Sequence, residues 1–74
     1  MVTIPEIRAA RALLGWSQPE LARRLNVSPR TLKRLELGDG ALTGYSDQIE
    51  SVFREAGVEF LSSLNDGVGV RQRV

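Results

Sequence analysis

The chain has 74 residues, the size of one small domain with a modest core. It contains no cysteine and no histidine, which excludes disulfide bridges and thiolate metal sites and leaves only scattered carboxylates for acid–base chemistry. Residues 1–34 carry seven Arg or Lys against two Glu, whereas residues 35–74 carry three Arg against seven acids. This asymmetry indicates that one face meets a polyanion; a solvated surface with chance clustering of charge is the alternative.

Nothing in the sequence indicates a membrane or catalytic function. Charged residues interrupt the apolar pattern of the N-terminus, and no stretch approaches the ~20 apolar residues of a membrane span. The acidic residues are dispersed, and the spacing of Asp39, Asp47 and Glu50 does not match a calcium loop. We therefore expect a soluble cytoplasmic protein with no membrane partner, catalytic residue, metal or cofactor.

The first predicted helix spans about residues 3–14, where apolar residues recur at helical spacing. Its first residues, TIPE, fit a capping box with Thr3 as the cap and Glu6 as its partner. Gly15 then ends the helix, as a C-terminal glycine commonly does.

The second predicted helix spans about residues 17–25 and begins in the same way. Ser17 is the cap, a proline lies in the first turn, and Glu20 follows three residues after the cap. A break at Asn26, the best residue after glycine for a left-handed conformation, separates this helix from the next.

Two more helices are predicted, at about residues 28–37 and 46–56. The third helix begins with a serine cap followed by a proline at its first position. Glycine and polar residues between positions 38 and 44 predict a loop before the fourth helix. Residues 1–57 would thus form a compact all-α domain of four helices.

Residues 58–74 change to a β-like period and form a predicted C-terminal tail. Two short runs rich in β-branched residues flank Asn65-Asp66-Gly67, and Asp-Gly between such runs suggests a hairpin. The tail either packs on the helices or pairs with another chain, and a frayed tail is the alternative. Phe60, Leu61 and Val70 are candidates for a dimer contact, with core packing as the equal alternative.

The second and third helices are short and only three residues separate them, so they must pack at a steep angle. The small side chain of Ala22 lets them cross closely, which is the helix-turn-helix plan and projects the N-terminal end of the later helix outward. Four residues at that end face away from the core: Pro29, Arg30, Lys33 and Arg34.

These four are the candidate residues for contacts with DNA bases. Arginine can donate to both O6 and N7 of guanine, so Arg30 and Arg34 are the strongest candidates for base recognition. Lys33 is ambiguous between a base and a phosphate, and Pro29 would make an apolar contact. A surface cation without a ligand is the alternative for each charged residue.

A second group of residues would bind phosphates. The second helix begins with a positive dipole end, with free backbone N–H groups at Gln18 and Glu20, and with the Gln18 amide as a further donor. The candidate phosphate-contacting residues are Ser17, Gln18, Arg24, Ser28 and Thr31. For Arg24, an exposed helix-surface cation is the alternative.

Residues 4–38 resemble the phage-repressor type of helix-turn-helix domain, the Xre/Cro-like family. The matching signature is Arg11-x-x-x-Gly15-x-Ser17-Gln18-x-x-Leu21-Ala22, then Val27-Ser28, then Leu35-Glu36-x-Gly38. The resemblance implies a helical domain that binds double-stranded DNA at a near-palindromic operator as a homodimer. It also implies a phosphate contact at Gln18, base-reading positions on the third helix, and a largely buried ion pair between Arg11 and Glu36.

The expected function is therefore that of a transcriptional regulator, a repressor or an activator. The alternative is a protein-binding helix-turn-helix module, such as an antitoxin or a regulator subunit with a regulatory protein as its partner. The cations at the tip of the third helix favour DNA, because a module that binds only protein has no need of them. Trp16 is expected to cover the edge of the core rather than to stack on a ligand.

Overall fold

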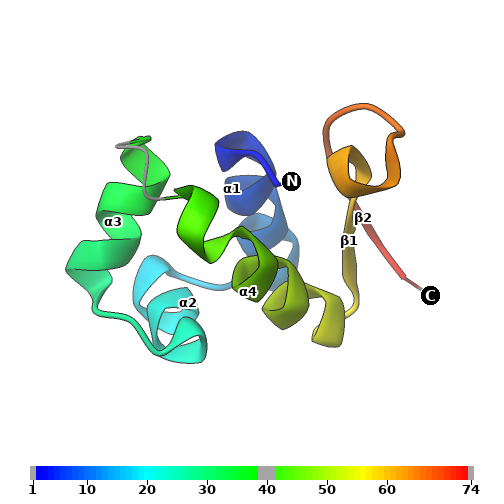
Figure 1. Cartoon of the computed structure of the whole chain (residues 1–74). Helices are drawn as coiled ribbons and strands as arrows, with labels where there is room; N and C mark the ends of the chain where they lie inside the picture. Colours follow the sequence, from blue (N-terminus) through cyan, green and yellow to red (C-terminus); the bar gives the residue numbers. More distant parts are fainter. Residues whose placement is uncertain (1, 39–41, 74) are drawn as a thin grey trace.

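The computed structural model describes residues 2–38 and 42–73, which form four helices and a C-terminal hairpin (Figure 1). The helices are α1 (Ile4–Leu14), α2 (Gln18–Leu25), α3 (Pro29–Leu37) and α4 (Leu42–Glu55). The hairpin contains β1 (Val58–Phe60), the 3-10 helix η1 (Leu61–Leu64) and β2 (Val70–Gln72). The predicted compact, mostly helical fold with a short β tail is thus confirmed.

The first three helices begin and end at residues that stabilise helix termini. The capping residues are Thr3, Ser17 and Ser28. The side chain of each accepts a hydrogen bond from the backbone N–H of the residue three positions further on. Each helix ends at a residue in the left-handed region: Gly15 (φ 68°), Asn26 (φ 60°) and Gly38 (φ 82°). These local signals therefore define the short helices and the tight turns between them.

The fourth helix begins at Leu42 and not near residue 46, so the prediction of its start was wrong. Gly44, expected in a loop, lies in its first turn. Leu42 and Tyr45 pack against the core and extend the apolar face of the helix toward its N-terminus. Their burial outweighs the roughly 1 kcal/mol that glycine costs inside a helix. Residues 39–41 of the expected loop lie outside the described residues.

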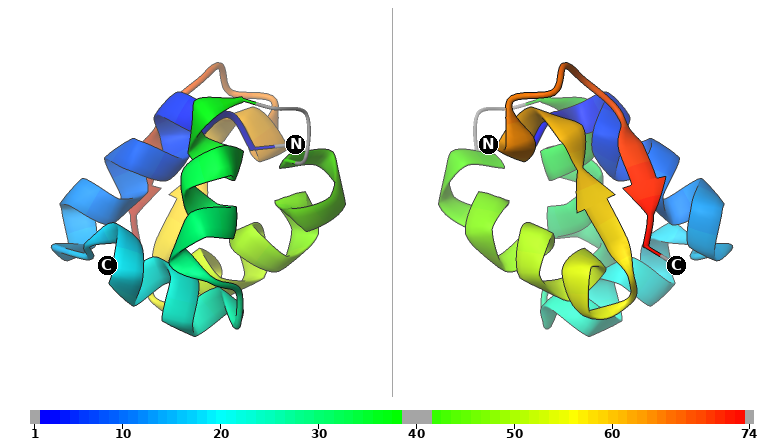
Figure 2. Two further views of the ribbon diagram at one scale, coloured as in Figure 1. Left: turned by 90° about the vertical axis from the view of Figure 1, so that its left-hand side faces the viewer. Right: turned by 90° about the vertical axis from the view of Figure 1, so that its right-hand side faces the viewer.

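The hairpin is antiparallel, but it is not the tight Asp-Gly turn that the sequence suggested. Phe60 pairs with Val70, and Asp66 and Gly67 lie in the long connection that follows η1. β1 packs on α4 and β2 on α1, so the hairpin covers one end of the helical part (Figure 2). Its order comes from this packing and not from a two-residue turn.

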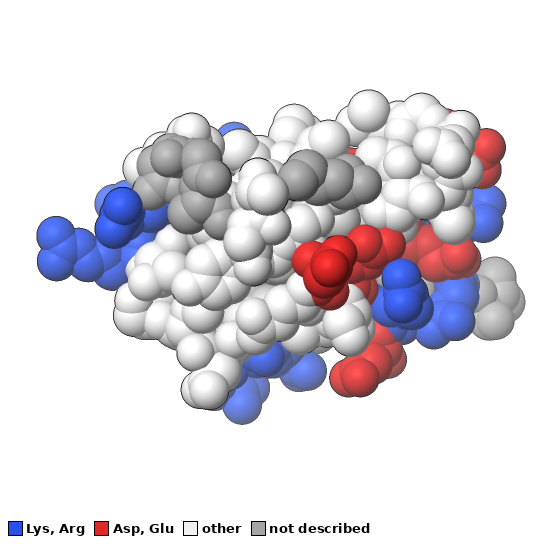
Figure 3. Space-filling model, viewed as in Figure 1, with Lys and Arg blue, Asp and Glu red and all other residues white. Residues whose placement is uncertain are grey.

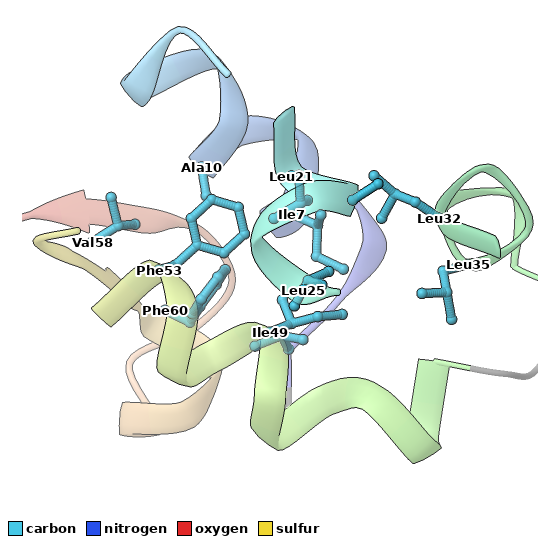
Figure 4. Close-up of a cluster of buried hydrophobic side chains, with 12 residues drawn as sticks. Ile7, Ala10, Leu21, Leu25, Leu32, Leu35, Ile49, Phe53, Val58 and Phe60 are labelled. Carbon is cyan, nitrogen blue, oxygen red and sulfur yellow. The ribbon is translucent and has the colours of Figure 1, made fainter. Parts of the chain in front are cut away.

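One core joins the helices and the hairpin (Figure 4). Phe53 of α4 meets Phe60 of β1 edge to face, with ring centroids 5.5 Å apart. Val58 and Phe60 are 1% and 2% exposed, and Val70 packs against the same cluster. Two of the three candidates for a dimer contact, Phe60 and Val70, therefore pack in the core of their own chain, which was the alternative for them.

Glu6 attaches the hairpin to the beginning of α1. Its buried carboxylate accepts hydrogen bonds from the N–H groups of Thr3 (2.9 Å), Ser62 (3.1 Å) and Gly69 (3.0 Å) and from the Ser62 hydroxyl (2.6 Å). Burial raises the pKa of Glu6, but the hydrogen bonds from Ser62, Gly69 and Thr3 outweigh this effect and lower the pKa to about 2. The sequence indicated only the capping role of this residue.

Candidate nucleic-acid interface

α2 and α3 are joined by a turn of three residues and held together around Ala22. This residue is 1% exposed, and its carbonyl accepts a hydrogen bond from the N–H of Val27 in the turn (3.0 Å). Gln48 of α4 donates its side-chain amide to the carbonyl of Leu25 (2.7 Å) and so caps the C-terminal end of α2. α3 consequently lies at one edge of the molecule, opposite the hairpin (Figures 1 and 2).

The outward face of α3 carries the predicted base-contacting residues. Leu32 and Leu35 are 0% exposed and fix which face of the helix is buried. The four predicted residues, Pro29, Arg30, Lys33 and Arg34, are all exposed, and Leu37 at the C-terminal end of the helix is exposed as well. Neither Arg30 nor Lys33 pairs with a carboxylate of residues 2–38 or 42–73. On the side shown in Figure 3, the charged residues where α3 lies are Lys and Arg, whereas Asp and Glu lie over the C-terminal half of α4 and beyond, with Lys or Arg beside them.

The N-terminus of α2 offers fewer backbone donors than the sequence suggested. The N–H of Glu20 donates to the Ser17 hydroxyl (3.2 Å), so the prediction that it is free was wrong. The residue before it is proline, which has no N–H. Of the two backbone N–H groups expected to bind an anion here, that of Gln18 remains. It lies at the positive end of the helix dipole.

Glu36 of α3 connects all three helices of this region. Glu36 is 3% exposed, and its carboxylate accepts hydrogen bonds from Nε and Nη2 of Arg11 on α1 (3.0 Å each) and from Nε2 of Gln18 on α2 (3.2 Å). Arg8 donates Nη2 to the main-chain oxygen of Glu36 (2.9 Å), and its Nε lies 3.7 Å from the carboxylate. The ion pair between Arg11 and Glu36 is thus part of a larger network.

The sequence analysis did not identify Arg8 as a member of this network. A signal was present, because Arg8 precedes Arg11 by three residues and so lies on the same face of α1. The Gln18 contact could not have been found in this way, since it joins residues on two different helices.

At the N-terminus of α3, two hydroxyl groups form a small exposed cluster. The Ser28 hydroxyl accepts the backbone N–H of Thr31 (3.1 Å) and donates to the Thr31 hydroxyl (2.9 Å). Both oxygens are therefore held beside the exposed cations of the same helix.

Arg24 has partners within its own chain. Its Nε lies 2.8 Å from the Glu20 carboxylate, and its guanidinium lies 4.1 Å from the centroid of the Trp16 ring. Arg23 contacts the same carboxylate oxygen, so two cations share one acid and this surface keeps a positive charge. Trp16 stacks on Phe53 (5.2 Å between ring centroids) and covers the edge of the core.

Other kinds of site have little support in the described part of the chain. Residues 2–38 and 42–73 contain no group of three or more acidic residues placed to hold a metal ion. None of the described helices is both long and apolar enough to cross a membrane. An open hollow of about 310 Å³ between α2 and α4 is lined by Arg24, Val52, Glu55 and Ala56.

Comparison with protein families agrees with this geometry. A family model described as helix-turn-helix, of the Xre/Cro type, matches residues 7–44, more than half of the chain. No curated protein and no solved structure gave a significant match. Domains of this family are non-enzymatic, and membership implies DNA binding. The chain belongs to the Xre/Cro-type helix-turn-helix family of DNA-binding domains.

Proposed function

We propose that the protein is a transcriptional regulator that acts in the cytoplasm and binds a near-palindromic DNA operator as a homodimer. The observation that carries the proposal is the outer face of α3, where Arg30 and Lys33 are exposed and have no carboxylate partner among the described residues. Unpaired cations on a projecting helix suit the major groove of DNA, because they face both phosphates and the acceptor atoms of guanine.

The four outward residues of α3 have different roles in this proposal. Arg30 and Arg34 each donate two hydrogen bonds to a guanine, and each such contact contributes about 1–3 kcal/mol of base preference. Lys33 contacts a base or an adjacent phosphate. Pro29 has no N–H to donate and makes an apolar contact, for example with a thymine methyl group.

The phosphate contacts come from the ends of α2 and α3. Ser17 and Gln18 lie at the N-terminus of α2, and Ser28 and Thr31 at that of α3. Both helix ends direct a positive dipole toward the backbone of the DNA. Arg24 is the additional cation: because it shares the Glu20 carboxylate with Arg23, the pair of arginines can neutralise a phosphate without leaving Glu20 unpaired.

Binding as a homodimer would supply the specificity that a single α3 lacks. One nine-residue helix presents only a few outward side chains, whereas two helices on one DNA face double the number of base contacts. Half-sites one DNA turn apart require the two recognition helices to lie about 34 Å apart.

The proposal is tested by selecting a binding site from random duplex DNA and mapping the protected bases. We expect two inverted half-sites whose centres are about 10 bp or a multiple of it apart. We also expect an affinity that falls steeply with salt, since phosphate contacts release counterions. Equal affinity for the selected duplex and for a scrambled competitor would contradict the proposal and would favour a protein-binding role.

Replacing Arg34 with alanine tests the assignment of base recognition. We expect Arg34→Ala to relax the preference at one base pair of each half-site, with a loss of about 1–3 kcal/mol on the selected site and a smaller loss on scrambled DNA. The matched control is Arg54→Ala, which removes an exposed cation from α4, away from α3. Equal losses on both duplexes from Arg34→Ala would refute a base contact.

A further inference from the structure

The hydrogen bond between Gln18 and Glu36 orients the side-chain amide at the N-terminus of α2. Nε2 of Gln18 lies 3.2 Å from Oε1 of Glu36. A carboxylate can only accept hydrogen bonds, so the nitrogen and not the oxygen of the amide must face Glu36. The nitrogen carries two N–H groups, and Glu36 uses one of them.

Glu36 is itself held in place from several directions. Its carboxylate is almost completely buried and makes two hydrogen bonds with Arg11. Its main-chain oxygen accepts a further hydrogen bond from Arg8. A group fixed in this way on α3 is a rigid reference point for the more exposed side chain of Gln18 on α2.

We propose that Glu36 is a positioning residue for DNA binding, which acts through Gln18. By fixing one N–H of the Gln18 amide, Glu36 directs the second N–H outward to the phosphate that meets the N-terminus of α2. Without Glu36 the amide can rotate and present its oxygen, which a phosphate repels. This inference rests on the proposed function, because it assigns Glu36 a role in the same phosphate contact.

The experiment is a double-mutant cycle between Gln18→Ala and Glu36→Asp, measured as affinity for selected and scrambled duplexes. Aspartate withdraws the carboxylate from both partners; the long side chain of Arg11 can follow the negative charge, whereas the shorter side chain of Gln18, at the fixed end of α2, cannot. We expect each single variant to lose about fivefold in affinity on both duplexes, the effect of one hydrogen bond. In the Gln18→Ala background, Glu36→Asp should cause no additional loss.

A purely structural role for Glu36 predicts a different pattern. Loosening of α3 would reduce the preference for the selected duplex and would do so equally with and without Gln18, and that result would overturn the proposal. Phe60→Leu, a core variant in the hairpin on the side opposite α3, controls for lost stability alone. It should lower the melting temperature without changing the affinity of the folded protein.

A second measurement keeps the proposal testable if Glu36→Asp does not fold. In the free native protein, the side-chain amide of Gln18 should show restricted motion by NMR relaxation, because Glu36 holds it. A freely rotating amide would overturn the proposal even if the native protein binds DNA. If the native protein binds no DNA, the proposed function falls together with this inference, whereas binding without coupling refutes only the role of Glu36.

Discussion

At the residue scale, two buried glutamates are stabilised in different ways. Glu36 is surrounded by arginine side chains and an amide, whereas Glu6 is held by backbone N–H groups and a hydroxyl. A buried carboxylate is costly unless its lone pairs are satisfied, and both solutions satisfy them. For Glu6 the hydrogen bonds favour the charged form, so the stability of the fold should depend on pH.

The first prediction concerns Glu6 and acid. Its folded-state pKa of about 2 is below its ordinary value of 4.5, so its contribution is complete above pH 4.5 and is lost as the pH falls toward 2. The free energy of unfolding should decrease by about 3 kcal/mol through this group, measured by urea unfolding from pH 6 to pH 2. Glu6→Gln should be less stable at pH 7, because its amide N–H groups would face other donors.

The control for Glu6 is Glu59→Gln, which removes a carboxylate that pairs with Arg71 on the surface of the hairpin. Surface pairs contribute little, so this variant should retain most of the acid dependence of the native protein. If Glu6→Gln showed the same pH dependence as the native protein, the Glu6 carboxylate would not be the group responsible.

At the element scale, what the sequence could predict depends on how local the cause is. Thr3, Ser17 and Ser28 begin helices through contacts with residues three positions away, and such contacts can be seen in the sequence. The early start of α4 depends on the packing of Leu42 and Tyr45 on a core built from other elements. The contact of Gln18 with Glu36 has the same long-range character, so the sequence indicated both residues of this pair but not their hydrogen bond.

Two glycines on either side of the undescribed segment provide the second prediction. Gly38 has a φ of +82°, and an added Cβ would lie 3.3 Å from Cδ1 of Ile4, so Gly38→Ala should destabilise the fold. The expected cost is about 1–2 kcal/mol, a decrease in melting temperature of about 4–8 °C per kcal/mol.

Gly44→Ala is the matched control for Gly38. Gly44 lies within α4, and an added Cβ would meet nothing within 4 Å. This variant should stabilise the protein by about 0.5–1 kcal/mol, since alanine is the better helix former. Thermal unfolding followed by circular dichroism distinguishes the two, and equal melting temperatures would contradict the assigned backbone conformations.

At the scale of the whole molecule, the hairpin and the helices share one core. Phe60 contacts Phe53, Val58 is 1% exposed, and Glu6 binds Ser62 and Gly69 of the connection between the strands. The hairpin lies opposite α3, so its core contacts stabilise the helices from the side away from the candidate DNA-binding residues (Figure 1).

The third prediction follows from this shared core. A chain truncated after Gly57 loses the two core side chains of β1, each of which contributes about 1.5–3 kcal/mol when buried. Because small domains have little stability to spare, the truncated chain should show no cooperative thermal transition by circular dichroism. A cooperative transition with the native melting temperature would mean that the helices do not depend on the hairpin.

The position of Trp16 also has a practical consequence. It is the single tryptophan of the chain, and it lies directly before the cap of α2, in contact with the Phe53 ring and the Arg24 guanidinium. Its fluorescence therefore comes from one place, where α2 meets α4 and where the DNA backbone would approach. Emission from the unlabelled protein should report both unfolding and the arrival of a duplex.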